Sequence, residues 1–128
     1  AKKELFANPL LGWFFRGTGA IPVDRRGDAT AALRAALEVL SKGACLAVFP
    51  EGTRVKPGER RPAKAGVSFL ASRSHAPVVP VRMVGTAEFP WTFPLDARFG
   101  KPMPPPETED RATGCAYAQA VMDAVYAL

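Results

Sequence analysis

The junction that decides the fold joins the apolar run Cys45-Leu46-Ala47-Val48-Phe49 to the polar turn Pro50-Glu51-Gly52-Thr53-Arg54. The run is short, continuous and apolar, which predicts a buried strand. The turn then presents a carboxylate, a glycine, a hydroxyl and a guanidinium where this strand ends. Polar side chains placed at the end of a core strand indicate a site for a polar, anionic ligand.

A second junction of the same kind lies upstream, where Ala20-Ile21-Pro22-Val23 passes into Asp24-Arg25. Between the two junctions, Asp28 stands at a helix N-cap position and Lys42-Gly43 supplies a typical helix end. Further on, the patterns predict a short helix over 63–74, a strand over 78–84, a short strand around 97–99 and a helix over 110–128.

Alternating strands and helices at these spacings predict an α/β fold. We expect a single domain over residues 1–128 with a mixed, largely parallel sheet flanked by helices. Ligands of such sheets bind beyond the carboxyl ends of the strands. The two polar junctions are therefore expected on one rim of the sheet.

The bulk composition agrees with one globular domain that carries a positive charge. The chain has 128 residues, 48% hydrophobic and 23% charged, with a net charge of +5 and a pI near 9.6. Phosphate, nucleic acid and an anionic membrane surface are the partners that this charge favours. No apolar run approaches the roughly 18 residues of a membrane span. Cys45 and Cys115 lack metal-ligand spacing and are expected to be buried free thiols.

Two groups of cations form the candidate anion site. Arg25 and Arg54 follow the two predicted strands, and a guanidinium holds phosphate through paired, charge-assisted hydrogen bonds. The alternative is that they are solvated or paired with Asp24 and Glu51. A basic cluster extends the site; it could attract an anionic leaflet or a phosphate, or be an ordinary solvated loop. It consists of Arg54, Lys56, Arg60, Arg61 and Lys64.

Aromatic residues and the chain's one histidine have more ordinary interpretations. The run from Leu10 to Phe15 could enter a lipid interface or line an acyl groove, although such runs usually belong to the core. The same holds for Trp91 and Phe93. His75 lies in a serine-rich loop without a neighbouring carboxylate, which favours a surface or loop-packing histidine.

These motifs resemble the phospholipid/glycerol acyltransferase family, and in particular bacterial 1-acyl-sn-glycerol-3-phosphate acyltransferases. The stretches from Gly19 to Arg25, from Phe49 to Arg54 and from Val78 to Val81 are similar to the family's second, third and fourth motifs. Ala1-Lys2-Lys3-Glu4-Leu5 resembles the segment before the second motif, and Lys64-Ala65-Gly66 the Lys-x-Gly after the third. The likeness is strongest over residues 1–86.

The resemblance implies an acyltransferase that moves a fatty acyl group from acyl-CoA or acyl carrier protein to lysophosphatidate. It implies no cofactor beyond the acyl donor, no metal, no nucleic acid, and association with the cytoplasmic face of the cell membrane. The residues that it implies for binding the acceptor's phosphate are Arg25, Glu51, Gly52, Thr53, Arg54 and Lys64.

One departure from the family pattern concerns catalysis. The family's first motif, His-x-x-x-x-Asp, is absent, and His75 lies downstream without the aspartate. That histidine is the family's general base, and a positioned base contributes about 10²–10⁴-fold. We therefore expect an N-terminally truncated acyltransferase domain that is nearly inactive alone. The alternatives are a non-catalytic lipid- or phosphate-binding module and a basic nucleic-acid-binding domain, whose affinity would fall steeply with salt.

Overall fold

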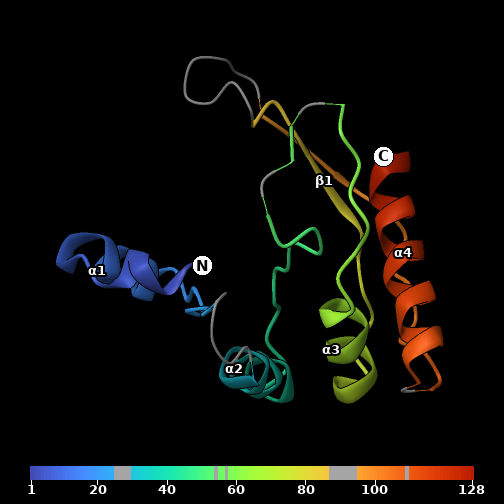
Figure 1. Ribbon diagram of the computed structural model, residues 1–128, viewed down its shortest axis with the longest axis horizontal. Coiled ribbons are helices and arrows are strands. Elements are labelled where there is room, and N and C mark those ends of the chain that lie inside the picture. The colour runs from blue at the N-terminus through green and yellow to red at the C-terminus, as the bar shows by residue number, and fades with distance from the viewer. Residues whose placement is uncertain (25–29, 54, 57, 87–94, 109) are drawn as a thin grey trace. The chain divides into compact units, whose positions relative to one another are not determined.

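The computed structural model describes residues 1–24, 30–53, 55–56, 58–86, 95–108 and 110–128 (Figure 1). The chain divides into two compact units, which we call unit 1 (residues 1–46) and unit 2 (residues 47–128). Each unit is described by itself. The expectation of a single domain stays a prediction.

Unit 1 contains a short 3₁₀ helix, η1 (Lys3–Phe6), and the helices α1 (Pro9–Gly17) and α2 (Thr30–Ser41). Asn8 caps α1 because its side-chain oxygen accepts hydrogen bonds from the amides of Leu10 and Leu11 at 3.0 and 3.2 Å. Pro9 occupies the first helical position, where no amide hydrogen is needed. Asn8 and Pro9 therefore determine where α1 begins.

The end of α2 confirms the predicted helix stop at Lys42-Gly43. Gly43 has φ = +73°, a left-handed conformation that glycine adopts without penalty. Its amide donates to the carbonyl of Leu40, and the next amide, of Ala44, donates to Val39. This pair of bonds is a Schellman motif, which satisfies the last carbonyls of the helix.

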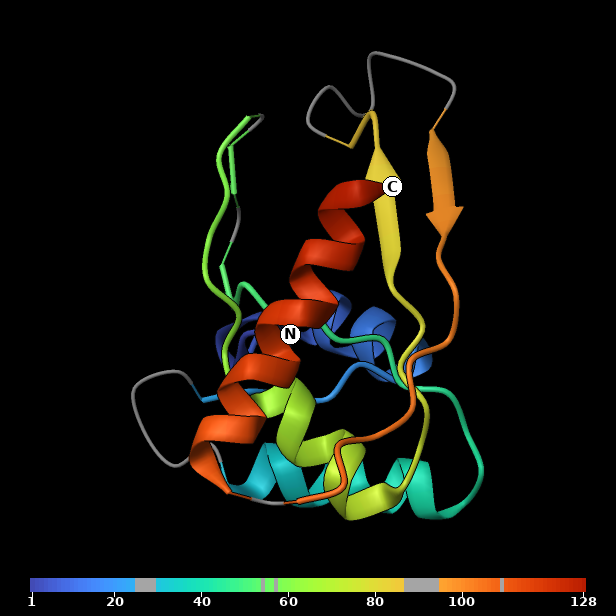
Figure 2. The same ribbon diagram turned by 90° about the vertical axis from the view of Figure 1, so that its right-hand side faces the viewer.

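Unit 2 contains α3 (Gly66–Ser74), the strands β1 (Val81–Val84) and β2 (Asp96–Phe99), and α4 (Arg111–Ala127). The strands pair antiparallel, with Val81 opposite Phe99 and Val84 opposite Asp96. α4 lies along β1, and α3 packs beside the N-terminal half of α4 (Figures 1 and 2). Apolar faces of α3 and α4 form the core, together with Pro80; the buried residues are Val67, Leu70, Ala71, Ala118, Val121 and Met122.

Two arginines connect the β1–β2 ladder to the end of α4. Arg82 and Arg98 are directly opposite across the ladder, a placement of like charges that is unfavourable by itself. Their guanidinium groups donate to the carbonyls of Tyr126 and Leu128 at 3.1 and 2.8 Å. Because the C-terminal end of a helix carries partial negative charge, these contacts offset the repulsion.

The predicted strands are only partly present. Residues 96–99 form β2 and residues 81–84 form β1, which confirms both regions. Residues 20–23 contribute one parallel bridge, between Val23 and Lys2, and residues 45–49 form no ladder with any described residue. An apolar run favours extended backbone, but a strand also needs a neighbour to exchange hydrogen bonds. The largely parallel sheet is therefore not confirmed.

Three predictions about burial were wrong. The run over residues 45–49 is not buried, and Phe49 is 75% exposed. Cys45 and Cys115 are free thiols as expected, but both are exposed. The aromatic run forms α1 instead of a core segment, and Leu10 and Trp13 are 75% and 73% exposed. These segments are apolar in sequence, but burial depends on which face of an element packs against a neighbour. The sequence pattern does not determine that neighbour.

Candidate functional site

The polar turn after residue 49 is a hydrogen-bonded β-turn in unit 2. The amide of Gly52 donates to the carbonyl of Phe49 at 3.0 Å. Pro50 occupies the second position of this turn, which its fixed φ favours, and Gly52 the fourth. Gly52 has φ = +66°, so the backbone there is left-handed. The turn leaves Glu51 half-buried and Thr53 exposed.

Lys64 closes the far end of the same loop over this turn. Its amide donates to the carbonyl of Pro50 at 2.9 Å. Its side chain crosses the open face of Gly52: a Cβ at Gly52 would lie 2.6 Å from the Lys64 Cε and 2.8 Å from Nζ. Such distances are too short for real contacts. A side chain at Gly52 would therefore be strained by the left-handed backbone, and it would displace the flexible end of Lys64.

The basic loop between the turn and Lys64 is held by Tyr126, at the end of α4. The amide of Arg61 donates to the Tyr126 hydroxyl at 3.2 Å. The guanidinium of Arg60 lies over the Tyr126 ring, 5.1 Å from its centre, as a cation–π contact. Lys56 and Arg61 are exposed. Residues 60 and 61 are therefore held by α4, in addition to the bond between Lys64 and Pro50.

The structure brings together four of the six residues that the family resemblance implied for phosphate binding. Glu51, Gly52, Thr53 and Lys64 lie in one turn and its closing residue. Arg25 and Arg54 lie outside the described residues, so the pairing of the two guanidinium groups stays a prediction. Trp91 and Phe93 lie outside them as well.

The upstream motif of unit 1 is described up to Asp24. Its carboxylate accepts a hydrogen bond from Lys3 Nζ at 2.5 Å, which raises the pKa of Lys3. The amide of Lys3 also donates to the carbonyl of Val23. The segment resembling the one before the second motif is therefore joined directly to that motif.

The prediction for His75 is confirmed. It is exposed at the C-cap of α3, where it adopts the left-handed conformation with φ = +54°. Among the described residues no group of three or more His, Cys, Asp or Glu is placed to hold a metal ion. Nor is any helix of the described part long and apolar enough to cross a membrane.

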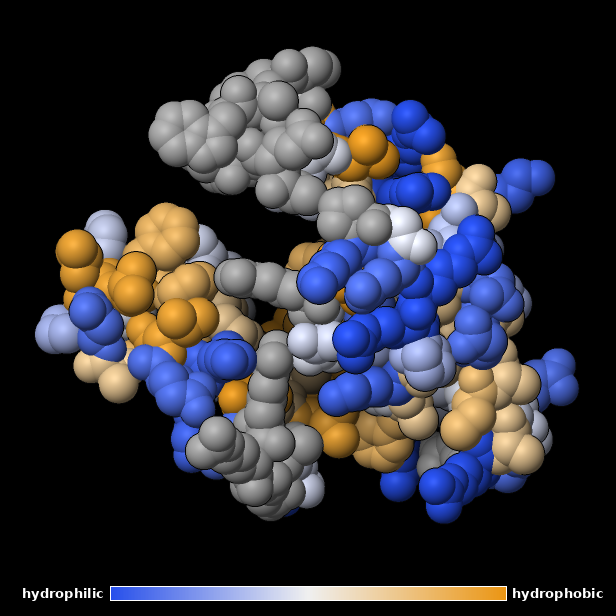
Figure 3. Space-filling model, turned by 45° about the horizontal axis from the view of Figure 1, so that its top comes forward, coloured by the Kyte–Doolittle hydropathy of each residue, from blue (hydrophilic) through white to orange (hydrophobic). Residues whose placement is uncertain are grey.

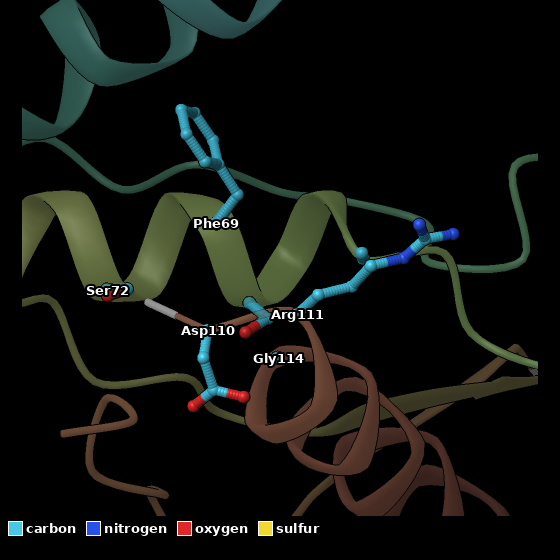
Figure 4. Close-up of a pocket in the computed structure, with 7 residues that line it drawn as sticks. Phe69, Ser72, Asp110, Arg111 and Gly114 are labelled. Atoms are coloured by element: carbon cyan, nitrogen blue, oxygen red, sulfur yellow. The ribbon is translucent and has the colours of Figure 1, made fainter. Parts of the chain in front are cut away.

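A pocket of about 280 Å³ opens between α3 and the start of α4. Its lining includes Ser72 on α3 and Asp110 and Gly114 at the start of α4. In Figure 4 the carboxylate of Asp110 points away from α3, and the side chain of Arg111 extends outward. Ser68 and Ser72 are buried, and Ser68 Oγ lies 3.2 Å from where a Cβ of Gly114 would be. Hence Gly114 lets the two helices approach closely at this point.

Asp110 is the exposed N-cap of α4, and its carboxylate caps the helix. Its carboxylate accepts hydrogen bonds from the Thr108 hydroxyl at 2.6 Å and the Thr113 amide at 2.9 Å. These bonds hold the pKa of Asp110 well below its usual range. Asp110 therefore stays ionised near neutral pH as a structural cap, which makes it a poor candidate for acid–base chemistry.

Sequence reasoning missed Tyr126 because this residue lies far from every motif. A partial signal existed, since Tyr126 follows Met122 by four residues and so shares the inward side of α4. The sequence pattern indicated only that this side of α4 is apolar and packs in the core. It gave no sign that the hydroxyl would bind the loop some 65 residues earlier.

The chemistry available at the turn is anion binding. An ammonium group, a threonine hydroxyl and a left-handed glycine backbone lie within one small surface. Backbone at a left-handed glycine can approach a ligand closely, and a lysine binds phosphate as a compact point charge. The described residues here are suited to binding and positioning.

Comparison with known proteins identifies the family. The family model described as Acyltransferase matches residues 1–84. The 1-acyl-sn-glycerol-3-phosphate acyltransferases of Bacillus subtilis and Limnanthes douglasii are both 36% identical to the chain, over 85 and 121 residues. The alignments cover 66% and 86% of this chain, but only 42% of each relative.

A solved structure is similar over nearly the whole chain. It is the 1-acyl-sn-glycerophosphate acyltransferase PlsC of Thermotoga maritima, with a TM-score of 0.70 and 29% identity over 99% of this chain and 54% of that protein. The chain thus spans about half or less of the proteins that it resembles. Since the family model covers well over half of the 128 residues, including the 49–54 turn and Lys64, the chain belongs to the acyltransferase family.

Proposed function

We propose that the protein transfers a fatty acyl group from acyl-CoA or acyl carrier protein to the free hydroxyl of 1-acyl-sn-glycerol-3-phosphate, giving phosphatidate for phospholipid synthesis. The observation that carries the proposal is the Lys64 ammonium group seated over Gly52 inside a family motif. The relatives at 36% identity are named for this acceptor, which supports the substrate class.

In this proposal the turn binds the acceptor's phosphate. Lys64 supplies a charge, and the Thr53 hydroxyl and the backbone near Gly52 supply hydrogen-bond donors. Arg25 and Arg54 complete the site in the proposal, on the strength of their motifs. Holding the phosphate places the glycerol hydroxyl in a fixed position, which lowers the entropic cost of the reaction. The half-buried Glu51 belongs to the same turn and to the proposed site.

The rest of the proposal follows the family. The acyl donor is a substrate, so no cofactor is required, and the protein works at the cytoplasmic face of the cell membrane. The general base of the reaction is not among the described residues, because the single histidine, His75, is exposed at the end of α3. A mixed, largely parallel sheet stays part of the proposal, supported by the parallel bridge between Lys2 and Val23.

The test measures both turnover and binding. The complete gene product should form phosphatidate from lysophosphatidate and acyl-CoA or acyl carrier protein. Lys64→Met should raise the acceptor KM roughly 10- to 100-fold, because a charge-assisted hydrogen bond is worth about 1.5–3 kcal/mol. Lys101→Met, which changes an exposed lysine outside the basic cluster, serves as the control. Lysophosphatidate binding without any product would favour a non-catalytic module, and unchanged binding in Lys64→Met would contradict the site.

A further inference from the structure

The helix α1 has its apolar side turned outward. Around the helix, Leu10, Trp13 and Phe14 share one side and are 75%, 73% and 55% exposed. The opposite side carries Gly12, which is buried, and Phe15, which is half-buried. An ordinary surface helix has the reverse arrangement.

The packing of unit 1 explains this orientation. A Cβ on Gly12 would lie 2.7 Å from the carbonyl oxygen of Phe6, so η1 meets α1 at its glycine. The ring of Phe15 packs 5.8 Å from that of Phe6. With Asn8 and Pro9 fixing where the helix starts, the inward side is set, and the large apolar residues are left on the outside.

We propose that this outward face of α1 (Leu10, Trp13 and Phe14) binds a lipid surface with anionic head groups. In the space-filling view hydrophobic side chains gather over α1, with hydrophilic ones along their border (Figure 3). Tryptophan favours the boundary between lipid and water. An amphipathic helix with Trp, Phe and Leu on one side lies in the plane of that boundary, where its apolar side chains are buried.

The charge around α1 favours anionic lipid over a protein partner. Arg16 lies in the last turn of α1, and Lys2 lies immediately before η1, which packs against α1. Lys3 is paired with Asp24, and Glu4 adds one negative charge to η1. Each cation near an anionic leaflet strengthens binding roughly fivefold. The inference that this surface delivers the acceptor rests on the proposed function, since lysophosphatidate is itself an amphiphile that resides in such surfaces.

Fluorescence of Trp13 tests the proposal without altering α1. In the complete gene product with its other tryptophans replaced by phenylalanine, Trp91 included, the emission of Trp13 is followed with vesicles of phosphatidylcholine and phosphatidylglycerol. Lipids brominated in the acyl chains should quench it, and phosphatidylcholine alone should bind more weakly. Absence of quenching would overturn the proposal, because it would place another part of the protein, or a second copy, over Trp13.

Vesicle sedimentation adds a matched comparison. Replacing both Leu10 and Trp13 by glutamine should lower vesicle partition roughly 100-fold, about tenfold for each large apolar side chain. Phe99→Gln changes a residue of unit 2 with a similar exposure, 70%, and should leave partition unchanged. Thermal unfolding is measured in parallel. A fall in Tm with unchanged partition in the double variant would show that α1 packs inside the protein.

Activity separates this inference from the proposed function. With short-chain lysophosphatidate dissolved as monomers, the double variant should keep its turnover, whereas turnover on vesicle-borne acceptor should fall about as much as partition does. Loss of turnover on both forms would overturn the lipid-surface role. If the unaltered protein acylated neither form while Trp13 was still quenched, only the acyl-transfer proposal would fall.

Discussion

Replacing Gly52 by alanine should impair acceptor binding far more than it impairs folding. Two effects follow from the structure. The backbone at φ = +66° becomes strained, which costs roughly 1 kcal/mol for a residue with a Cβ. The new Cβ would also lie 2.6–2.8 Å from the Lys64 side chain, whose flexible end must then move away.

The displaced ammonium group determines the magnitude for binding. If Lys64 loses its contact with the phosphate, the lost interaction is worth about 1.5–3 kcal/mol, which corresponds to roughly 10- to 100-fold in affinity. Unfolding in denaturant should report only the strain of about 1 kcal/mol. Calorimetric titration with short-chain lysophosphatidate and urea unfolding of the same samples measure the two quantities.

Gly58 provides a matched control in the same loop. It has φ = +83°, but no atom lies within 4 Å of the position that its Cβ would take. Gly58→Ala should therefore lose similar stability and keep its affinity. Gly52→Asn should show the converse, because asparagine tolerates the left-handed conformation but still carries a Cβ. Equal losses of affinity in Gly52→Ala and Gly58→Ala would refute the reasoning.

A double variant tests whether the effect passes through Lys64. Lys64→Met keeps most of the side-chain length and removes the charge. If Gly52→Ala acts by displacing that charge, adding it to Lys64→Met should cost no further affinity. Additive losses would mean that Gly52 contributes to binding independently, for instance through its own backbone.

Three further predictions concern α4. Tyr126→Phe should cost about 1 kcal/mol of stability, since it removes the hydrogen bond from the Arg61 amide. Tyr117→Phe should be neutral or stabilising, because the Tyr117 hydroxyl is buried with no partner among the described residues. Urea unfolding measures the stability of both variants. Asp110→Asn should remove a pH-dependent part of stability. Because the pKa of Asp110 is lowered on folding, the native protein should lose this part as pH falls below about 4, and the variant should not. A Tm that falls equally with acid in both would contradict it.

Local sequence signals predicted elements that depend on neighbouring residues alone. The stop at Gly43 and the C-terminal helix beginning after Asp110 are both present, because capping is a contact between residues a few positions apart. The turn at Gly52 is of the same kind. Such features could be predicted because their hydrogen-bond partners are adjacent in the chain.

The pattern predicted the strands β1 and β2, but it could not show which apolar segments would find a partner or a buried place. Residues 45–49 have the composition of a strand, yet they form no ladder with any described segment. Trp13 is large and apolar, which is typical of a core residue, yet it is exposed because Gly12 and Phe15 occupy the inward side of α1. The sequence pattern indicates which backbone conformation a segment prefers. The neighbour against which the segment packs is determined only by the complete fold.

The candidate site depends on a part of the chain that the family model does not cover. The match ends at residue 84, but the basic loop before Lys64 is held by Tyr126. The last turn of α4 is in turn held by Arg82 and Arg98, which bond to its carbonyls.

This arrangement links the two strands, the C-terminal helix and the motif loop in one chain of contacts. A variant that weakens any link should loosen the loop and spread the positions of the Lys64 ammonium group, even though no residue of the motif has changed. The C-terminal residues are therefore expected to tune acceptor affinity through position, while the motif supplies the charge.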